Sequence, residues 1–136
     1  MIRNKYVAIV DDDERVRKGL AALMRAHGIE TRTFASGADF LKALPFGAPS
    51  CLIADVNMPE MNGLELQREL VRRGHRIATV VMTGNYDKSI RDRCRALGAI
   101  ACLPKPVESD TLLATLKSCW DAPSAPSLSV GTLTPP

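Results

Sequence analysis

Three carboxylates, one hydroxyl and one ammonium stand at or just after the ends of short apolar runs in this chain. They belong to Asp11, Asp12, Asp55, Thr83 and Lys105. If the apolar runs are strands of one parallel sheet, these side chains meet at its carboxyl edge, where such sheets bind ligands. The spacing therefore predicts one polar site assembled from four separate parts of the chain.

The chemistry of such a site follows from its charges. Three neighbouring carboxylates repel one another unless one of them is protonated or a cation lies between them. Oxygen ligands with room for water favour Mg²⁺, which often shares a phosphate oxygen. Lys105 and Thr83 add a positive charge and a hydrogen-bond donor, and Asp55 offers an oxygen nucleophile. The residues thus predict a site for Mg²⁺ and a phosphoryl group.

The apolar runs predict the strands that position these side chains. Before Trp120, short runs alternate with amphipathic stretches, which is typical of βα units around a parallel sheet. Three runs are continuous, as in central strands covered on both faces. Another alternates polar and apolar residues around Thr31 and Thr33, as expected at a sheet edge. The predicted strands are 6–10, 30–34, 51–54, 77–82 and 100–103.

Helical spacing of apolar residues predicts five helices in an α/β fold. Ser36 is expected to cap the second helix, while Gly28 and Gly98 end the first and fourth. Pro45 and Pro49 predict a loop between the second helix and the third strand. The helical segments are marked by Val16, Leu20, Leu23 and Met24; by Phe40, Leu41 and Leu44; by the stretch from Leu64 to about Arg73; by Ile90, Cys94 and Leu97; and by Leu112, Leu116, Cys119 and Trp120.

Length and composition favour one domain. The chain has 136 residues, 46% of them hydrophobic, and a formal charge of +3 that is too small to indicate nucleic-acid or membrane binding. It has neither a secretory signal pattern nor an apolar stretch that could span a membrane, and its four irregularly spaced cysteines predict buried thiols in the cytoplasm. Residues 1–120 are expected to form the domain, and the Pro- and Ser-rich stretch 121–136 a flexible tail or linker.

Four segments resemble the signatures of bacterial two-component response-regulator receiver domains. They are Ile-Val-Asp-Asp-Asp-Glu at 9–14, Asp-Val-Asn-Met-Pro-Glu-Met-Asn-Gly at 55–63, Val-Met-Thr-Gly at 81–84 and Lys-Pro at 105–106. The text around the first and third segments is most similar to the FixJ-like branch. The resemblance spans residues 5 to about 119. It implies a flavodoxin-like fold, a five-stranded parallel sheet of order 2-1-3-4-5 with five helices.

The resemblance also implies roles for individual residues. Asp55 would be the phosphoacceptor for a histidine kinase. Mg²⁺ would be bound directly by Asp12, by Asp55 and by the backbone carbonyl of Asn57, with Asp11 acting largely through water. The protein would then be a phosphorylation-dependent switch and not an enzyme, beyond catalysing its own phosphorylation and dephosphorylation.

Two further residues are implied to contact the phosphoryl group. Lys105 would pair with its oxygens, and the Lys105–Pro106 peptide would be cis. Thr83 would donate a hydrogen bond to it and draw its own loop inward. Receiver domains usually carry Tyr or Phe three positions before this lysine, whereas this chain has Cys102. The signal is therefore expected to reach the face of the fourth helix, fifth strand and fifth helix through the backbone or Tyr86.

Alternative interpretations remain at this stage. Asp11 and Asp12 could simply cap the following helix. An aspartyl-phosphate phosphatase is a second hypothesis, although such enzymes carry an acid where this chain has Asn57, and a flavin-binding domain is a third. The expected partners are a histidine kinase and a protein or second copy bound to the fourth-helix face. Nucleic acid would be reached only through an output domain outside these residues; a stand-alone receiver is the other possibility.

Overall fold

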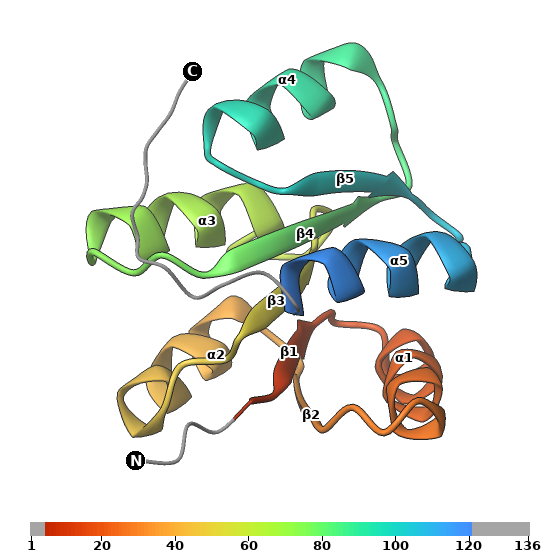
Figure 1. Cartoon of the computed structure of the whole chain (residues 1–136). Coiled ribbons are helices and arrows are strands. Elements are labelled where there is room, and N and C mark those ends of the chain that lie inside the picture. Colours follow the sequence, from red (N-terminus) through yellow and green to blue (C-terminus); the bar gives the residue numbers. More distant parts are fainter. Residues whose placement is uncertain (1–4, 121–136) are drawn as a thin grey trace.

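The computed structural model of the protein describes residues 5–120. It is a five-stranded parallel sheet with helices on both faces (Figure 1). The predictions for residues 1–4 and for the tail at 121–136 lie outside the described residues. In chain order the elements are β1 (Val7–Val10), α1 (Glu14–Ala26), β2 (Thr31–Phe34), α2 (Gly37–Ala43), η1 (Leu44–Phe46), β3 (Cys51–Asp55), α3 (Gly63–Arg72), β4 (Ala78–Thr83), α4 (Lys88–Ala96), β5 (Ala101–Pro104) and α5 (Ser109–Trp120).

The strand order is β2-β1-β3-β4-β5, as predicted. Every residue of β1 and β3 is buried, and β4 is buried after its first residue. The alternating strand β2 lies at one edge with its two middle residues exposed, and β5 lies at the other edge. Continuous apolar runs thus became central strands because both of their faces are covered by helices.

The register of the sheet brings the strand ends to one level. Val10 of β1 pairs with Ala54 of β3, so the residues that follow them, Asp11 and Asp55, emerge side by side. Asp55 in turn pairs with Met82, next to Thr83. The strand register therefore brings Asp11, Asp55 and Thr83 to one level at the carboxyl edge.

Two layers of core cover the sheet. Side chains alternate along each strand, so successive residues of β1 and β3 face opposite layers. In Figure 1, α1 and α5 lie on one side of the sheet, and α2, α3 and α4 lie on the other. The first layer contains Val7, Ile9, Met24, Ile53, Val80, Leu112 and Leu116. The second contains Ala8, Val10, Phe40, Leu52, Leu66 and Leu70, and is extended under α4 by Val56, Leu64, Val81 and Cys94.

Most of the predicted helix ends are confirmed. The Ser36 side chain caps α2 by accepting a hydrogen bond from the backbone N–H of Asp39 at 3.0 Å. Gly28 and Gly98 follow α1 and α4 in the left-handed conformation, with φ of 73° and 88°. The Lys105–Pro106 peptide is cis, as predicted.

Three local predictions are corrected. The stretch predicted as a loop after α2 begins with the short 3₁₀ helix η1, because Pro45 fits the first turn of a helix. Helix α3 begins at Gly63, one residue before the predicted start at Leu64, because Asn62 and Glu65 form a capping box there. The cap of α1 is Asp13, which accepts from the Arg15 N–H, so Asp11 and Asp12 do not serve as that cap.

The cysteines differ in burial. Cys51 and Cys94 are buried as predicted, whereas Cys102 and Cys119 are half-buried, because edge strand β5 and the last turn of α5 are only partly covered. All four thiols are free. Within residues 5–120, none of the helices has the length and apolarity that crossing a membrane requires.

Candidate functional site

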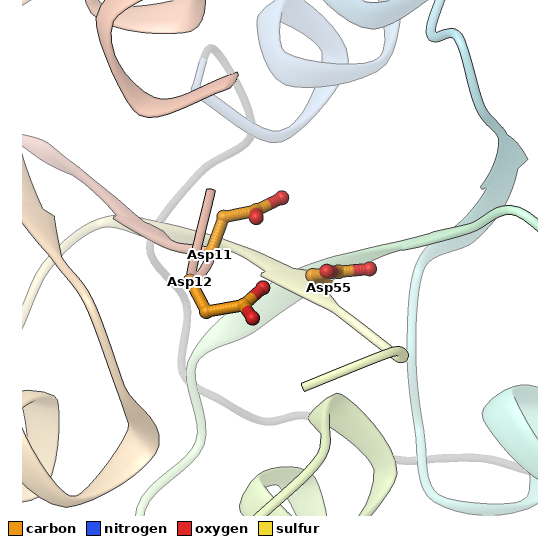
Figure 2. Close-up of side chains that lie close together, drawn as sticks. All are labelled: Asp11, Asp12 and Asp55. Atoms are coloured by element: carbon orange, nitrogen blue, oxygen red, sulfur yellow. The ribbon is translucent and has the colours of Figure 1, made fainter. Parts of the chain in front are cut away.

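Three aspartates meet at the carboxyl edge of the sheet, as their spacing predicted. Asp11 and Asp12 follow β1, and Asp55 is the last residue of β3 (Figure 2). One carboxylate oxygen from each lies within 4.8 Å of the others. Asp11 and Asp55 are 0% and 1% exposed, whereas Asp12 is open to solvent. The cluster therefore joins two buried charges to an accessible one.

Lys105, directly after β5, holds the two buried carboxylates. Its Nζ lies 3.1 Å from Asp11 Oδ2 and 3.2 Å from Asp55 Oδ2. Burial alone would lower the pKa of Lys105, but its hydrogen bonds and the charges of both aspartates raise that pKa above its ordinary value. The ammonium therefore stays charged at neutral pH. With Asp12 also present, the group keeps more negative than positive charge.

Asp55 is a carboxyl group, so burial shifts its pKa in the direction opposite to that for a lysine. Burial raises the pKa of this carboxyl above its ordinary value, and the nearby charge of Asp11 acts in the same direction. The N–H of Asn57 and the Lys105 ammonium oppose the shift. The ionised form of Asp55 is thus only partly compensated by protein groups, and a cation among these oxygens would stabilise it.

Backbone donors fix the two buried carboxylates. Asp11 Oδ1 accepts from the N–H of Asp13 at 2.9 Å, and Asp55 Oδ1 accepts from the N–H of Asn57 at 3.1 Å. The Arg17 guanidinium donates to the carbonyl oxygen of Asp11 at 2.7 Å. Arg17 was not anticipated, because the reach of its side chain from the first turn of α1 back to Asp11 depends on the direction in which α1 leaves the sheet, and no local pattern gives that direction.

A glycine allows α3 to approach the phosphoacceptor candidate. A Cβ at Gly63 would lie 2.7 Å from the carbonyl oxygen of Asp55 and 3.0 Å from its carbonyl carbon. Both are backbone atoms, so neither can move aside as a flexible side chain could. Gly63 therefore permits the first turn of α3 to pack against Asp55 and supports the loop that carries it.

The neighbouring loops bring a hydroxyl and an amide to the same edge. Thr83, the last residue of β4, is buried, and its Oγ1 accepts from the N–H of Asn85 at 3.0 Å. The hydroxyl proton is thereby left to donate elsewhere. The exposed Asn57 accepts from the N–H of Gly84 at 3.3 Å and links the loop after β3 to the loop after β4.

Cys102 lies away from the carboxylates, on the side of β5 that faces α4. It packs against a cluster containing Val81 and Cys94. Tyr86 is 45% exposed, and the guanidinium of Arg91 lies 5.3 Å from the centre of its ring. Position 102 therefore carries a small thiol, whereas the ring of Tyr86 is partly exposed in the loop between β4 and α4.

The donor set fits a hard divalent cation. The three clustered groups offer only carboxylate oxygens, one of them solvent-accessible, and their negative charge exceeds that of Lys105. Hard cations such as Mg²⁺ take oxygen ligands and retain several waters, which the open side at Asp12 would admit. The geometry thus combines a cation site with a fixed carboxylate, a hydroxyl and an ammonium.

Comparison with known proteins identifies the family. Residues 7–117 match the response regulator receiver domain. This chain belongs to that family. The chain is therefore a receiver domain of two-component response regulators, and the comparisons give no support to the phosphatase alternative.

Its relatives place it near the FixJ-like receiver domains. It is 37% identical over 115 residues to the transcriptional regulatory protein FixJ of Azorhizobium caulinodans, covering 82% of this chain and 53% of the relative. It is 36% identical over 116 residues to the response regulator protein TmoT of Ectopseudomonas mendocina, covering 85% and 53%. The chain thus spans about half the length of these relatives.

Solved structures agree with the fold. The crystal structure of FixJ-N superposes with a TM-score of 0.81 at 30% identity, covering 91% of this chain and 99% of that one. A response regulator receiver protein from Burkholderia phymatum gives a TM-score of 0.77 at 35% identity, covering 91% and 100%. The predicted receiver fold is therefore confirmed.

Proposed function

We propose that Asp55 of this receiver domain accepts a phosphoryl group from a histidine kinase. The observation that carries the proposal is the arrangement at the carboxyl edge, in which Asp11, Asp12 and Asp55 place oxygens within 4.8 Å and Lys105 reaches two of them. The carboxylate of Asp55 accepts a hydrogen bond from the Asn57 N–H, and its backbone packs against Gly63 at the start of α3.

The reaction transfers a phosphoryl group between two nucleophiles. A carboxylate oxygen of Asp55 forms a bond to phosphorus as the bond from phosphorus to the donor's imidazole nitrogen breaks, and the electron pair remains on that nitrogen. The product is an acyl phosphate on Asp55. Lys105 supplies positive charge to the phosphoryl oxygens, and the Thr83 hydroxyl donates a hydrogen bond to one of them.

We further propose that this chemistry requires Mg²⁺. Asp12, Asp55 and the backbone carbonyl of Asn57 would hold the ion directly, with Asp11 acting largely through water. When bound, Mg²⁺ neutralises charge on the phosphoryl oxygens and lowers repulsion between the carboxylates. The protein's contribution is to keep the oxygens fixed before the donor arrives, which the N–H groups of Asp13 and Asn57 do.

The consequence of phosphorylation is a change of partner. When the Thr83 hydroxyl turns to the phosphoryl group, the loop after β4 moves with it and alters the face formed by α4, β5 and α5. That face would bind a protein partner or a second copy. With Cys102 in β5, no ring swings inward, so the change would pass through the backbone of this loop or through Tyr86.

The remaining parts of the proposal concern the whole protein. We propose that residues 1–120 form the receiver unit and that 121–136 act as a tail or linker. The relatives named transcriptional regulatory proteins suggest an output domain that reaches nucleic acid in a longer protein. The domain would be a cytoplasmic switch and not an enzyme acting on external substrates.

A phosphodonor experiment tests the site. Incubation with acetyl phosphate and Mg²⁺ should add one phosphoryl group, measured by intact mass, and EDTA should prevent it. Asp55→Asn should abolish the adduct. Asp13→Asn is the matched control, because Asp13 is a neighbouring aspartate that caps α1 and an asparagine can cap it equally well.

Two outcomes would contradict the proposal. One is an adduct of equal yield in Asp55→Asn. The other is release of phosphate over many turnovers from small phosphomonoesters, which would indicate a phosphatase.

A further inference from the structure

A pair of cysteines lies at the amino edge of the sheet, opposite the aspartate cluster. Cys51 is the first residue of β3, and Cys119 lies in the last turn of α5. Both pack in the core layer between the sheet and the helices α1 and α5. Figure 1 shows the C-terminal turns of α5, in dark blue, beside β3. Elements far apart in the sequence thus bring two thiols together.

The two thiols have unequal surroundings. Cys51 is fully buried, whereas Cys119 is only half-buried. Cys51 at the start of β3 and Cys119 in the last turn of α5 lie on the same side of the sheet, and these two elements contact each other. The neighbouring Cys51 lowers the pKa of Cys119, whereas the neighbouring Cys119 together with burial raises the pKa of Cys51. The less buried cysteine is therefore the one favoured as a thiolate.

We propose that Cys119 and Cys51 form a reversible oxidation site that responds to hydrogen peroxide. Cys119, the accessible sulfur, reacts first, and the adjacent buried Cys51 then closes a disulfide. Reversible redox sensors often place an accessible cysteine beside a resolving cysteine. In reducing cellular conditions such a disulfide is transient, which suits a signal.

The chemistry balances with peroxide as the oxidant. The Cys119 thiolate attacks one peroxide oxygen, the O–O bond breaks, and hydroxide leaves as a sulfenic acid forms. The Cys51 sulfur then attacks the sulfur of Cys119, the S–O bond breaks, and water leaves. Overall, two thiols lose two electrons and two protons, and one peroxide becomes two water molecules.

The disulfide would tie the last turn of α5 to the start of β3. Helix α5 belongs to the face that is proposed to change partners, so oxidation would restrain one element of it. Asp55 lies at the other end of β3, and its carboxylate makes no contact with either sulfur. Phosphorylation by acetyl phosphate should therefore proceed in the oxidised protein, which separates this inference from the function proposed above.

The chain contains an internal comparison. Cys94 of α4 and Cys102 of β5 form a second pair in one packed cluster, and burial together with the neighbouring Cys102 raises the pKa of Cys94 to about 12. Both residues lie within regular elements packed on each other, with Cys102 paired to Val81 in the sheet. Cys119, in contrast, lies one residue from the end of its helix. The closer approach that an S–S bond of about 2.05 Å demands is easier at a helix end.

The first experiment locates the bond. The full chain is treated with hydrogen peroxide under native conditions, and unreduced peptides are mapped by mass spectrometry. We expect a peptide pair linked through Cys51 and Cys119, reversed by dithiothreitol, with the thermal midpoint raised by roughly 5 °C or more because a long loop is closed. The link should be lost in Cys119→Ser and kept in Cys102→Ser, which is the matched control.

The second experiment assigns the order of reaction. In Cys51→Ser, Cys119 should be trapped as a sulfenic acid that dimedone labels, whereas in Cys119→Ser dimedone should not label Cys51. Cys51→Ala replaces the first variant if thermal melting shows that serine disrupts the fold. The proposal is overturned if the link forms between Cys94 and Cys102, if only intermolecular disulfides form, or if dimedone labels Cys51 in place of Cys119.

Discussion

The two edges of the sheet bury different kinds of polar group. At the carboxyl edge, Asp11 and Asp55 are almost completely buried as charged groups, and Lys105 contacts both. Near the amino edge, the corresponding groups are neutral: the thiol pair of Cys51 and Cys119, and the amide of Gln67, which is 3% exposed. Strand β3 shows the difference directly, because it begins with the neutral thiol of Cys51 and ends with the buried carboxyl of Asp55.

This difference indicates that the candidate functional site at the carboxyl edge lowers the stability of the fold. A buried charge costs far more free energy than a buried amide or thiol unless a partner compensates it. The register of β1 and β3 places two such charges next to each other, where repulsion adds to the cost. We therefore expect substitutions of similar size to have large effects at the carboxyl edge and small effects elsewhere.

Removal of the Lys105 ammonium should produce the largest effect. Lys105→Met leaves Asp11 and Asp55 buried without their ammonium partner, and should lower the free energy of unfolding by about 3 kcal/mol in the absence of divalent ions. Added Mg²⁺ should recover part of this loss. Urea unfolding in EDTA and in excess Mg²⁺ measures both quantities.

Lys88→Met provides the comparison for that measurement. Lys88 pairs with Asp92 at 2.9 Å, but both side chains are exposed. Its loss should cost under about 0.5 kcal/mol. If both variants lost the same free energy of unfolding, the ion pairs of Lys105 at the carboxyl edge would contribute no more than an exposed surface pair.

Gly63→Ala should give the next largest effect. The new Cβ would meet the Asp55 backbone at 2.7 Å, so α3 or the strand end must shift, at about 2 kcal/mol. Phosphorylation should fall as well, because Asp55 moves. Gly19→Ala is the control: Gly19 lies within α1 with no atom within 4 Å of an added Cβ, and alanine there should stabilise by about 0.5–1 kcal/mol.

The pH dependence of stability should reveal Asp55 in a smaller effect. Its folded pKa is raised, so between the unfolded value of about 3.9 and the folded value the native state binds more protons than the unfolded state. The free energy of unfolding contributed by Asp55 is thus present below this window and is lost as pH rises through it. Asp55→Asn should remove this slope in urea titrations with EDTA.

Asp13 should titrate in the opposite direction. Its pKa is lowered, first by the hydrogen bond from the N–H of Arg15, so its contribution is present above the unfolded pKa and is lost as pH falls through the folded pKa. Asp13→Asn should therefore remove a contribution to the free energy of unfolding that increases with pH, whereas the contribution of Asp55 decreases with pH. The same sign in both variants would contradict the assigned environments.

The smallest effect is expected at Gln67. Its Nε2 donates to the carbonyl oxygen of Leu97 at 3.2 Å, while its Oε1 is buried with no partner among residues 5–120. Gln67→Met removes one hydrogen bond and one unpaired acceptor together, and these nearly cancel, so stability should change by under about 0.5 kcal/mol. Urea unfolding measures this change. If Gln67→Met lowered the free energy of unfolding as much as Lys105→Met does, the expected difference between the two edges would be contradicted.

The sequence predicted the carboxyl edge better than the rest. Continuous apolar runs identified β1, β3 and β4, and the residues after them had to meet once the strands were parallel. Asp11, Asp55 and Lys105 were therefore brought together as expected. Apolar periodicity and capping residues likewise predicted the helices, because both are local properties of the chain.

The missed features depend on contacts between elements. The 2.7 Å hydrogen bond from Arg17 to Asp11 requires the angle at which α1 leaves the sheet. The pairing of Cys51 with Cys119 requires α5 to cross β3 at its start, and no local spacing records that crossing. Partial exposure of Cys102 follows from the position of β5 at the sheet edge, which was assigned through the family resemblance and not from its own residues.

The two outer strands also limit how this protein can associate. β2 is four residues long and exposes Arg32, whose guanidinium lies 4.2 Å from the ring centre of Tyr6, and β5 ends in Pro104, which has no N–H to offer. Short edge strands that carry a cationic side chain or a proline resist pairing with a strand from another molecule. These edges therefore disfavour association by strand pairing, which leaves the side chains of the helices and loops as the surfaces that can contact another molecule.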